Sequence, residues 1–310
     1  MWCSVSWHFI FYKMQKDKVA NLIHLHFIVF IWGFTAILGK LISIDSLPLV
    51  WYRMLIATLV IMVYLLWMKI PLKVDKKTLL WFITAGIVVA LHWVTFFLAI
   101  KVSTVSVALA MMSTGAFFTA LLEPLLFKRK IIGYEIFFGI LVVMGLYLIF
   151  KVETNYSYGM GIALLSAFLA AIFAIINGKL VQTNRPAVIS YYELGIGVLF
   201  LTIILAVNGS YTVDFFTVGT MDWVYLIVLG VLCTAYAFIA AVKVMRVLTP
   251  YTVMLTTNLE PVYGILLAWF IFGNEEKMNP LFYVGAGIIL ATVIANGVLK
   301  QRTGIKRKVS

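Results

Sequence analysis

Ten long apolar runs divide this chain, and they limit its possible fold more than any other feature. Most contain about 18–25 residues, the length that an α-helix needs to cross a hydrocarbon core of about 30 Å. None shows the alternation of apolar and polar residues typical of membrane β-barrel strands. The sequence therefore predicts an all-α polytopic membrane protein with ten transmembrane helices, at about 21–41, 47–68, 78–100, 103–127, 131–150, 157–179, 187–207, 221–243, 248–272 and 280–300.

The composition excludes several classes of protein. Of the 310 residues, 64% are hydrophobic and 12% are charged, whereas soluble domains carry roughly a quarter charged residues. The sequence has no G-x-x-x-x-G-K-[ST] stretch, so no P-loop for ATP is expected and ion gradients must supply any energy. The two cysteines allow no disulfide framework, and we expect neither a metal nor a cofactor.

Basic residues concentrate in alternate connections between the runs. The connection 208–222 has neither Lys nor Arg and carries Asp214 and Asp222. The positive-inside rule then places both termini in the cytoplasm, so the net charge of +12 reflects topology and no nucleic acid is expected as a partner. We expect a multi-pass protein of the plasma (bacterial inner) membrane, surrounded by lipid bilayer, as a monomer or a homodimer.

The two halves of the chain repeat the same pattern of runs. At a constant offset of 146 residues, Leu109–Lys130 aligns with Leu255–Glu276. Each half has an odd number of runs, so the second half must insert upside down, as an inverted repeat does. We divide the chain into a cytoplasmic N-terminal tail, two five-helix repeats and a basic cytoplasmic tail, at 1–20, 21–152, 153–300 and 301–310. Met14 opens a more natural start, so residues 1–13 are expected to be a mis-assigned start or a loose extension.

Four stretches form a pattern that belongs to a known family: WGFTAILGKL (32–41), LPLVWYRMLIATL (47–59), HWVTFFLAIKVSTVSVALAMMSTGAFFTALLEPLLFKRK (92–130) and NLEPVYGILLAWFIFGNEE (258–276). They resemble the EamA family of the drug/metabolite transporter superfamily over about residues 20–300. The resemblance implies two inverted five-helix repeats around a central cavity, alternating access, and export or exchange of amino acids and other small metabolites. The halves differ, because Thr114 and Gly115 stand where the second half has Glu260 and Pro261.

Glu260 and Pro261 lie near the middle of the run 248–272. Ionisable side chains are rare at this depth, because burying their charge in a bilayer costs ~3 kcal/mol or more. Pro261 lacks a backbone N–H and displaces the carbonyl of Thr257, which opens the helix. A free carbonyl beside a carboxylate would make a proton or cation site, as in broken-helix transporters. The alternative is that Glu260 joins two helices permanently and that Pro261 only kinks its helix.

Other polar and aromatic residues are candidates for the cavity wall. Arg53 either binds a substrate carboxylate or extends toward the membrane surface or a neighbouring helix end. His92 either relays protons or is a hydrogen-bonded interior residue, and Trp93 beside it is expected to face the cavity. Tyr236 matches His92 at an offset of 144 residues, which favours one cavity lined by both.

Small polar residues near mid-membrane either line the cavity or join helices. Further candidates for the cavity wall are Trp32 and Thr35 on the first helix, and Ser113, Thr114 and Asn258 near mid-membrane. Tyr192 lies in the inner third of the seventh run. Glu193 beside it is either a second protonatable site or an ion-pair partner of Lys179 or Lys243.

These features predict a secondary active transporter that exports a small metabolite, such as an amino acid or a related amphipathic compound. Proton coupling is assigned to Glu260 and His92. The alternatives are a structural or regulatory membrane subunit without flux and an intramembrane lipid-modifying enzyme. An enzyme is not expected, since no catalytic pair is evident. The candidate substrate-binding residues are Trp32, Arg53, His92, Trp93, Thr114, Tyr192, Tyr236, Asn258 and Glu260.

Overall fold

The computed structural model describes residues 3–127 and 133–302, and within these ranges every regular element is helical. The first half contains α1 (Cys3–Leu41), α2 (Ser46–Trp67), α3 (Lys76–Val102), α4 (Val105–Met112), α5 (Gly115–Phe127) and α6 (Gly133–Val152). The second half contains α7 (Ser157–Leu180), α8 (Pro186–Val207), α9 (Val213–Phe216), α10 (Thr220–Gly230), α11 (Ala237–Val244), α12 (Pro250–Thr257), α13 (Glu260–Phe272) and α14 (Pro280–Arg302). Short turns of 3₁₀ or π-helix are η1 (Thr154–Tyr156), η2 (Val231–Tyr236) and η3 (Gly273–Glu276).

The predicted all-α membrane fold is confirmed. Among the described residues, eight helical segments are long and apolar enough to cross a bilayer. Two shorter apolar helices, Phe137–Val152 and Pro280–Asn296, complete a set compatible with ten spans. Three of the long spans are composite, because α4 continues into α5, α10 into α11 through η2, and α12 into α13.

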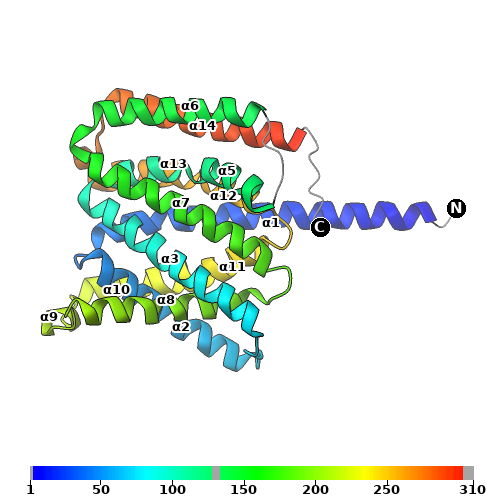
Figure 1. Ribbon diagram of the computed structural model, residues 1–310, viewed down its shortest axis with the longest axis horizontal. Helices are drawn as coiled ribbons and strands as arrows, with labels where there is room; N and C mark the ends of the chain where they lie inside the picture. The colour runs from blue at the N-terminus through cyan, green and yellow to red at the C-terminus, as the bar shows by residue number, and fades with distance from the viewer. Residues whose placement is uncertain (1–2, 128–132, 303–310) are drawn as a thin grey trace.

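The first helix begins much earlier than predicted. The sequence predicts a helix from about residue 21, whereas α1 starts at Cys3 and its apolar span covers Val19–Leu41. The early part of α1 projects beyond the bundle as a continuation of the same helix (Figure 1). Residues 3–13 are therefore helical.

The two halves pack through equivalent helices. In Figure 1, α6 and α14 lie side by side along one edge of the molecule, while α5, α12 and α13 cross its middle. Helix α2 packs on α8, α4 on α13, and α5 on α12, which is the pairing that a two-fold axis between inverted repeats produces. Glycines allow the closest approach, because a Cβ on Gly145 would lie 2.9 Å from the carbonyl oxygen of Gly285.

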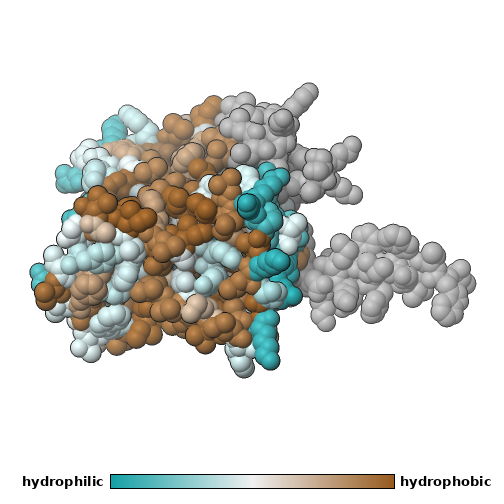
Figure 2. Space-filling view, turned by 60° about the horizontal axis from the view of Figure 1, so that its bottom comes forward, coloured by the Kyte–Doolittle hydropathy of each residue, from teal (hydrophilic) through white to brown (hydrophobic). Residues whose placement is uncertain are grey.

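An apolar belt separates two polar ends of the bundle. Figure 2 shows brown, hydrophobic residues across the middle and strongly hydrophilic residues gathered at one end. We call this the basic end; it contains the connections 68–75, 181–185 and 245–249. The opposite, acidic end contains the connections 42–45, 208–219 and 273–279. The belt is the surface that a bilayer covers.

Buried polar contacts close the acidic end. The Glu276 carboxylate accepts hydrogen bonds from two backbone N–H groups at the start of α4, at 3.1 and 2.9 Å, and from the Ser106 hydroxyl at 2.8 Å. Lys40 lies 3.0 Å from the same carboxylate. The Asp222 carboxylate accepts from the Ser43 backbone N–H at 2.9 Å and from its hydroxyl. These contacts join the end of α1 to both halves, and we call them the acidic-end clasp: Lys40, Ser43, Ser106, Asp222 and Glu276.

Candidate functional site: a central cavity

A cavity lies at the centre of the bundle, between α1, α2, α3, α4, α7, α11, α12 and α13. It contains about 950 Å³ of space free of protein atoms, its opening included. Its lining reaches Val242 and Met245 at the end of α11 and Val253 at the start of α12. The cavity therefore extends from mid-membrane toward the basic end, away from the acidic-end clasp.

The broken span α12–α13 brings a carboxylate to this cavity. Helix α12 ends at Thr257, and α13 begins at Glu260, with Pro261 in its first turn. Because Pro261 has no N–H, the carbonyl of Thr257 loses its usual helical partner. Thr257, Asn258, Glu260 and Pro261 all line the cavity. The break therefore exposes the polar start of α13 inside the membrane.

Arg53 contributes a buried cation from α2. Its side chain is 2% exposed, so it does not reach the membrane surface. The guanidinium carbon lies 3.9 Å from the ring centroid of Trp93, and Nε donates to the Thr234 hydroxyl at 2.6 Å. Nη1 is buried and has no hydrogen-bond partner among the described residues. No ion pair joins Arg53 to Glu260 in the described part of the chain, although both line the cavity.

His92 lines the cavity and is also anchored to α7. The Ser166 hydroxyl donates to the His92 carbonyl at 2.8 Å, so its oxygen accepts from Nδ1 at 2.9 Å. The Ser166 carbonyl also accepts from Nδ1, at 3.0 Å. Both groups are acceptors, so Nδ1 carries the proton of the neutral ring and Nε2 remains an acceptor. The two interpretations offered by the sequence are thus not exclusive.

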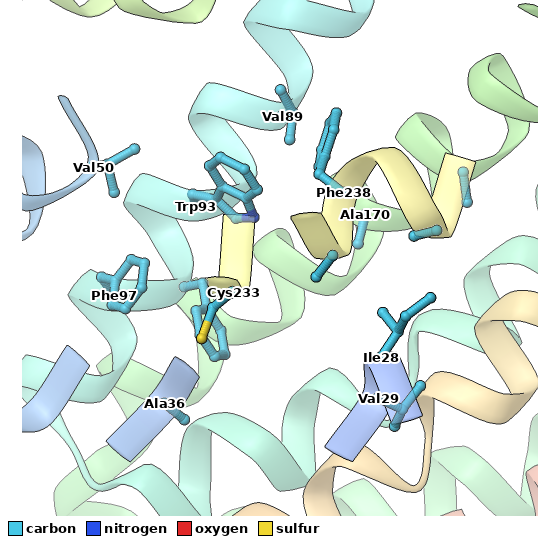
Figure 3. Close-up of a cluster of buried hydrophobic side chains, with 14 of the residues drawn as sticks. Ile28, Val29, Ala36, Val50, Val89, Trp93, Phe97, Ala170, Cys233 and Phe238 are labelled. Atoms are coloured by element: carbon cyan, nitrogen blue, oxygen red, sulfur yellow. The ribbon is translucent and has the colours of Figure 1, made fainter. Parts of the chain in front are cut away.

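Aromatic side chains form much of the wall. Trp93 packs edge-on against Phe238, with ring centroids 5.7 Å apart, and Phe238 contacts Phe173 at 5.3 Å. Figure 3 shows Trp93 on α3 near Cys233 and Phe238. Trp32 and Thr35 line the cavity from α1. Such a wall favours substrates with apolar or aromatic portions.

Three predicted residues do not line the cavity. Thr114 is fully buried, and its hydroxyl donates to the Met111 carbonyl at 2.7 Å. Tyr192 stacks on Phe82 and donates to the Leu72 carbonyl at 2.8 Å, near the basic end. Tyr236 is 41% exposed and lies 2.9 Å from His24 Nε2. These three side chains therefore form no part of the cavity wall in this structure, and their role in substrate binding stays a prediction.

The π-helical turn η2 explains the displacement of Tyr236. A π turn adds one residue to the helix and so rotates all later side chains about its axis. After this rotation Phe238, and not Tyr236, faces the cavity. Sequence reasoning also missed Phe173, Met112 and Met254 as lining residues, because nothing distinguishes one apolar side chain from another on a wholly apolar helix.

Of the nine candidate substrate-binding residues, six line the cavity and three do not. The six that line the cavity are Trp32, Arg53, His92, Trp93, Asn258 and Glu260. Among the described residues no three His, Cys, Asp or Glu side chains come close enough to hold a metal ion. The cavity joins one buried cation, one carboxylate, hydrogen-bonding groups and aromatic rings, which is the composition of a binding site for a small amphipathic molecule.

Inverted helix repeats around a central cavity are the architecture of many secondary transporters. The sequence profile of the EamA-like transporter family matches this chain twice, over residues 22–151 and 157–297. The chain therefore belongs to the EamA-like transporter family, and it is a membrane transporter.

Relatives agree with this assignment. An uncharacterized transporter of Archaeoglobus fulgidus is 22% identical over 89% of this chain and 95% of its own length. One from Clostridium kluyveri is 24% identical over 67% of this chain and 69% of its own. A solved crystal structure superposes on 92% of this chain and 99% of its own with a TM-score of 0.67, at 13% identity, which shows a shared fold.

Proposed function

We propose that this protein is a secondary active transporter that exports a zwitterionic amino acid, or a closely related amphipathic metabolite, across the plasma membrane. One observation carries the proposal: Arg53 and Glu260 line the same cavity, and no ion pair joins them in the described structure. A substrate with a carboxylate and an ammonium group would satisfy both at once.

The surroundings of Arg53 support an anionic group at this position. A buried guanidinium is costly unless its donors and its charge are compensated. Thr234 and the Trp93 ring compensate part of the group, whereas Nη1 has no partner. A substrate carboxylate would supply two oxygens in the fork geometry that guanidinium groups bind best. The aromatic wall then holds the substrate side chain.

We infer the direction of transport from the difference between the basic and acidic ends of the bundle. The cavity extends toward the basic end, and the acidic-end clasp closes the other. Because the positive-inside rule assigns the basic end to the cytoplasm, this conformation receives substrate from inside the cell. Release would require the clasp to open and the basic end to close, as alternating access does. An exporter would bind its substrate in this conformation.

Proton coupling is assigned to Glu260 and His92. Glu260 can bind a proton or a substrate ammonium group at the start of α13, but not both. Proton binding from outside would then displace the substrate, and proton loss to the cytoplasm would restore the carboxylate. His92 Nε2 is the second acceptor on the cavity wall.

Ligand binding tests the substrate class directly. Purified protein in lipid nanodiscs would be heated with apolar L-amino acids, with the matching amines that lack the carboxylate, and with the matching acids that lack the ammonium group. We expect only the zwitterions to raise the melting temperature, and R53Q to remove the shift. Stabilisation by sugars or by amines alone would contradict the assignment.

Transport itself is measured in proteoliposomes. A preloaded amino acid should exchange with labelled substrate outside, and an imposed pH gradient should drive net movement. If exchange persists but net flux does not respond to the pH gradient, the assignment of proton coupling is wrong and the assignment as a carrier stands. Absence of any exchange for every zwitterion tested would contradict the substrate assignment.

A further inference from the structure

Another acidic side chain lies inside the bundle but does not line the cavity. Glu193 on α8 has no exposed surface, and neither has Asn177 on α7. Asn177 Nδ2 donates to Glu193 Oε1 at 3.0 Å and to the Phe173 carbonyl at 3.3 Å. Both amide hydrogens are thereby used, which sets the orientation of the amide and leaves Oδ1 as an acceptor.

Two oxygen atoms of this pair lack a donor. Glu193 Oε2 and Asn177 Oδ1 are both buried, and neither has a hydrogen-bond partner among the described residues. Two acceptors cannot satisfy each other without a proton between them. A carboxylate here would also be a charge without compensation in the membrane interior.

Among the described residues no cation forms an ion pair with Glu193. Four helices contact α8, because α2, α3 and α11 pack on it and α7 reaches it through Asn177. Among the described contacts Glu193 makes no ion pair, so the sequence expectation of a partnership with Lys179 or Lys243 is wrong. The Lys side chains on these helices nearest the basic end are themselves exposed. The titratable and charged groups on α8 and on the four helices packed against it are Tyr52, Arg53, Tyr64, Lys76, Lys77, His92, Lys101, Tyr158, Lys179, Tyr191, Tyr192 and Lys243.

We propose that Glu193 is a second proton-binding site, held as a neutral carboxylic acid in a ring of two hydrogen bonds with Asn177. In this ring Asn177 Nδ2 donates to Oε1, and the protonated Oε2 donates to Asn177 Oδ1. A carboxylic acid and a primary amide are complementary in this way, since each presents a donor beside an acceptor. The added proton satisfies both orphan oxygens and removes the buried charge.

The position of the pair connects it to the cavity. Phe173 and Ala174 line the cavity one turn before Asn177 on α7, and the Phe173 carbonyl accepts from the Asn177 amide. A Cβ on Gly86 of α3 would lie 2.6 Å from the Glu193 carbonyl, so the two helix backbones touch here. Loss of the proton would place a charge at this contact and loosen α7 and α8 at the inward side of the cavity.

Infrared spectroscopy of the reconstituted full-length protein tests the site without any transport measurement. At pH 7, where an exposed glutamate is ionised, we expect a carbonyl band of a protonated carboxylic acid that E193Q removes. The matched control E260Q, at the glutamate on the cavity wall, should retain that band. In N177L the band should persist but shift in frequency, since its hydrogen-bond partner is gone. Absence of any acid band that depends on Glu193 would overturn the proposal.

Thermal unfolding provides a second, independent measurement. E193Q should melt near the wild-type temperature, because the glutamine amide also presents a donor beside an acceptor and can close the same ring. E193L should melt at a clearly lower temperature, since it leaves the Asn177 amide unpaired. Equal losses for E193Q and E193L would overturn the ring. Stabilisation by NaCl over choline chloride that E193Q abolishes would instead identify a sodium site. Neither measurement depends on the substrate, so this proposal and the transport proposal can fail separately.

Discussion

The broken spans α4–α5 and α12–α13 occupy equivalent places in the two repeats but differ in chemistry. At the offset of 146 residues, the breaks fall within one residue of each other, after Met112 and after Thr257. In the first half the Ser113 and Thr114 hydroxyls donate back to carbonyls of their own helix, at 2.6 and 2.7 Å. In the second half Pro261 opens the helix and Glu260 faces the cavity.

This difference separates the frame from the function. Both repeats interrupt the helix, so the interruption belongs to the shared architecture. Only the second repeat places an ionisable group there, while Thr114 satisfies its hydroxyl locally and stays out of the cavity. Arg53 adds the opposite charge from α2 of the first repeat. One asymmetric binding site is thus built on a symmetric frame.

Glu260 should give the largest effect. E260Q keeps the shape but removes the charge, and hydrogen bonds to charged groups contribute ~1.5–3 kcal/mol. We expect amino-acid exchange in proteoliposomes to fall roughly tenfold to hundredfold, at about tenfold per 1.4 kcal/mol. T114V at the equivalent position should change exchange by less than about threefold, because it removes only a neutral intrahelical hydrogen bond. Equal losses in the two variants would show that the breaks are functionally equivalent.

The variant P261A should give the second-largest effect on amino-acid exchange. P261A restores the backbone N–H, which can bond to the Thr257 carbonyl and straighten the span. We expect exchange to fall about tenfold, a shift of ~1.4 kcal/mol. The control P186A changes another proline in the first turn of a helix, where the missing N–H has no helical acceptor. Normal exchange in P261A together with impaired exchange in P186A would contradict the assigned role of the break.

The acidic-end clasp gives a smaller change, in stability. E276Q weakens a fully buried carboxylate with four hydrogen-bonding contacts, and we expect a loss of ~1–3 kcal/mol of unfolding free energy. E275Q is the matched control, because the neighbouring Glu275 lies 3.2 Å from Lys40 but is 73% exposed, and exposed pairs contribute ~0–1 kcal/mol. In E276Q, a cysteine at position 35 should also react faster with an impermeant thiol reagent. Identical unfolding of the two variants would argue against the clasp.

The smallest effect concerns another pair of equivalent positions, the N-caps of α3 and α10. Asp75 accepts from the backbone N–H groups of Lys77 and Thr78 and from the Thr78 hydroxyl, whereas Gly219, at the offset of 144, provides no side-chain cap. D75G should lower the melting temperature slightly, and G219S should raise it, since serine is a good N-cap.

The stabilisation that the Asp75 N-cap gives to α3 should depend on pH in a defined direction. The hydrogen bonds from Thr78 lower the pKa of Asp75 below its ordinary value. The stabilisation is therefore complete above the unfolded-state pKa of about 3.9 and is lost as the pH falls through the lower folded-state pKa. The difference in melting temperature between wild type and D75G should shrink on acidification. A difference that grows toward low pH would contradict the cap.

Most of the fold could be predicted from the sequence, and part of the site. The apolar runs predicted the spans, and the midplane position of Glu260 made it a candidate that the structure places on the cavity wall. Tyr236 was misplaced because the π turn η2 leaves no sign in a pattern of apolar residues. Phe173 and Phe238 were missed for a related reason, since no polar face marks the direction in which an apolar helix points.

Apolar length, charge distribution and internal repetition are local properties, so the sequence by itself determined the membrane fold, the two polar ends and the repeated frame. Which side chains meet depends instead on the rotation of each helix about its axis, and that is set by packing against the other helices. Only the tertiary structure brought Arg53 and Glu260 to one cavity and left Glu193 with Asn177 alone. Arg53 and Glu260 form one candidate site because helix packing orients both side chains toward the same cavity.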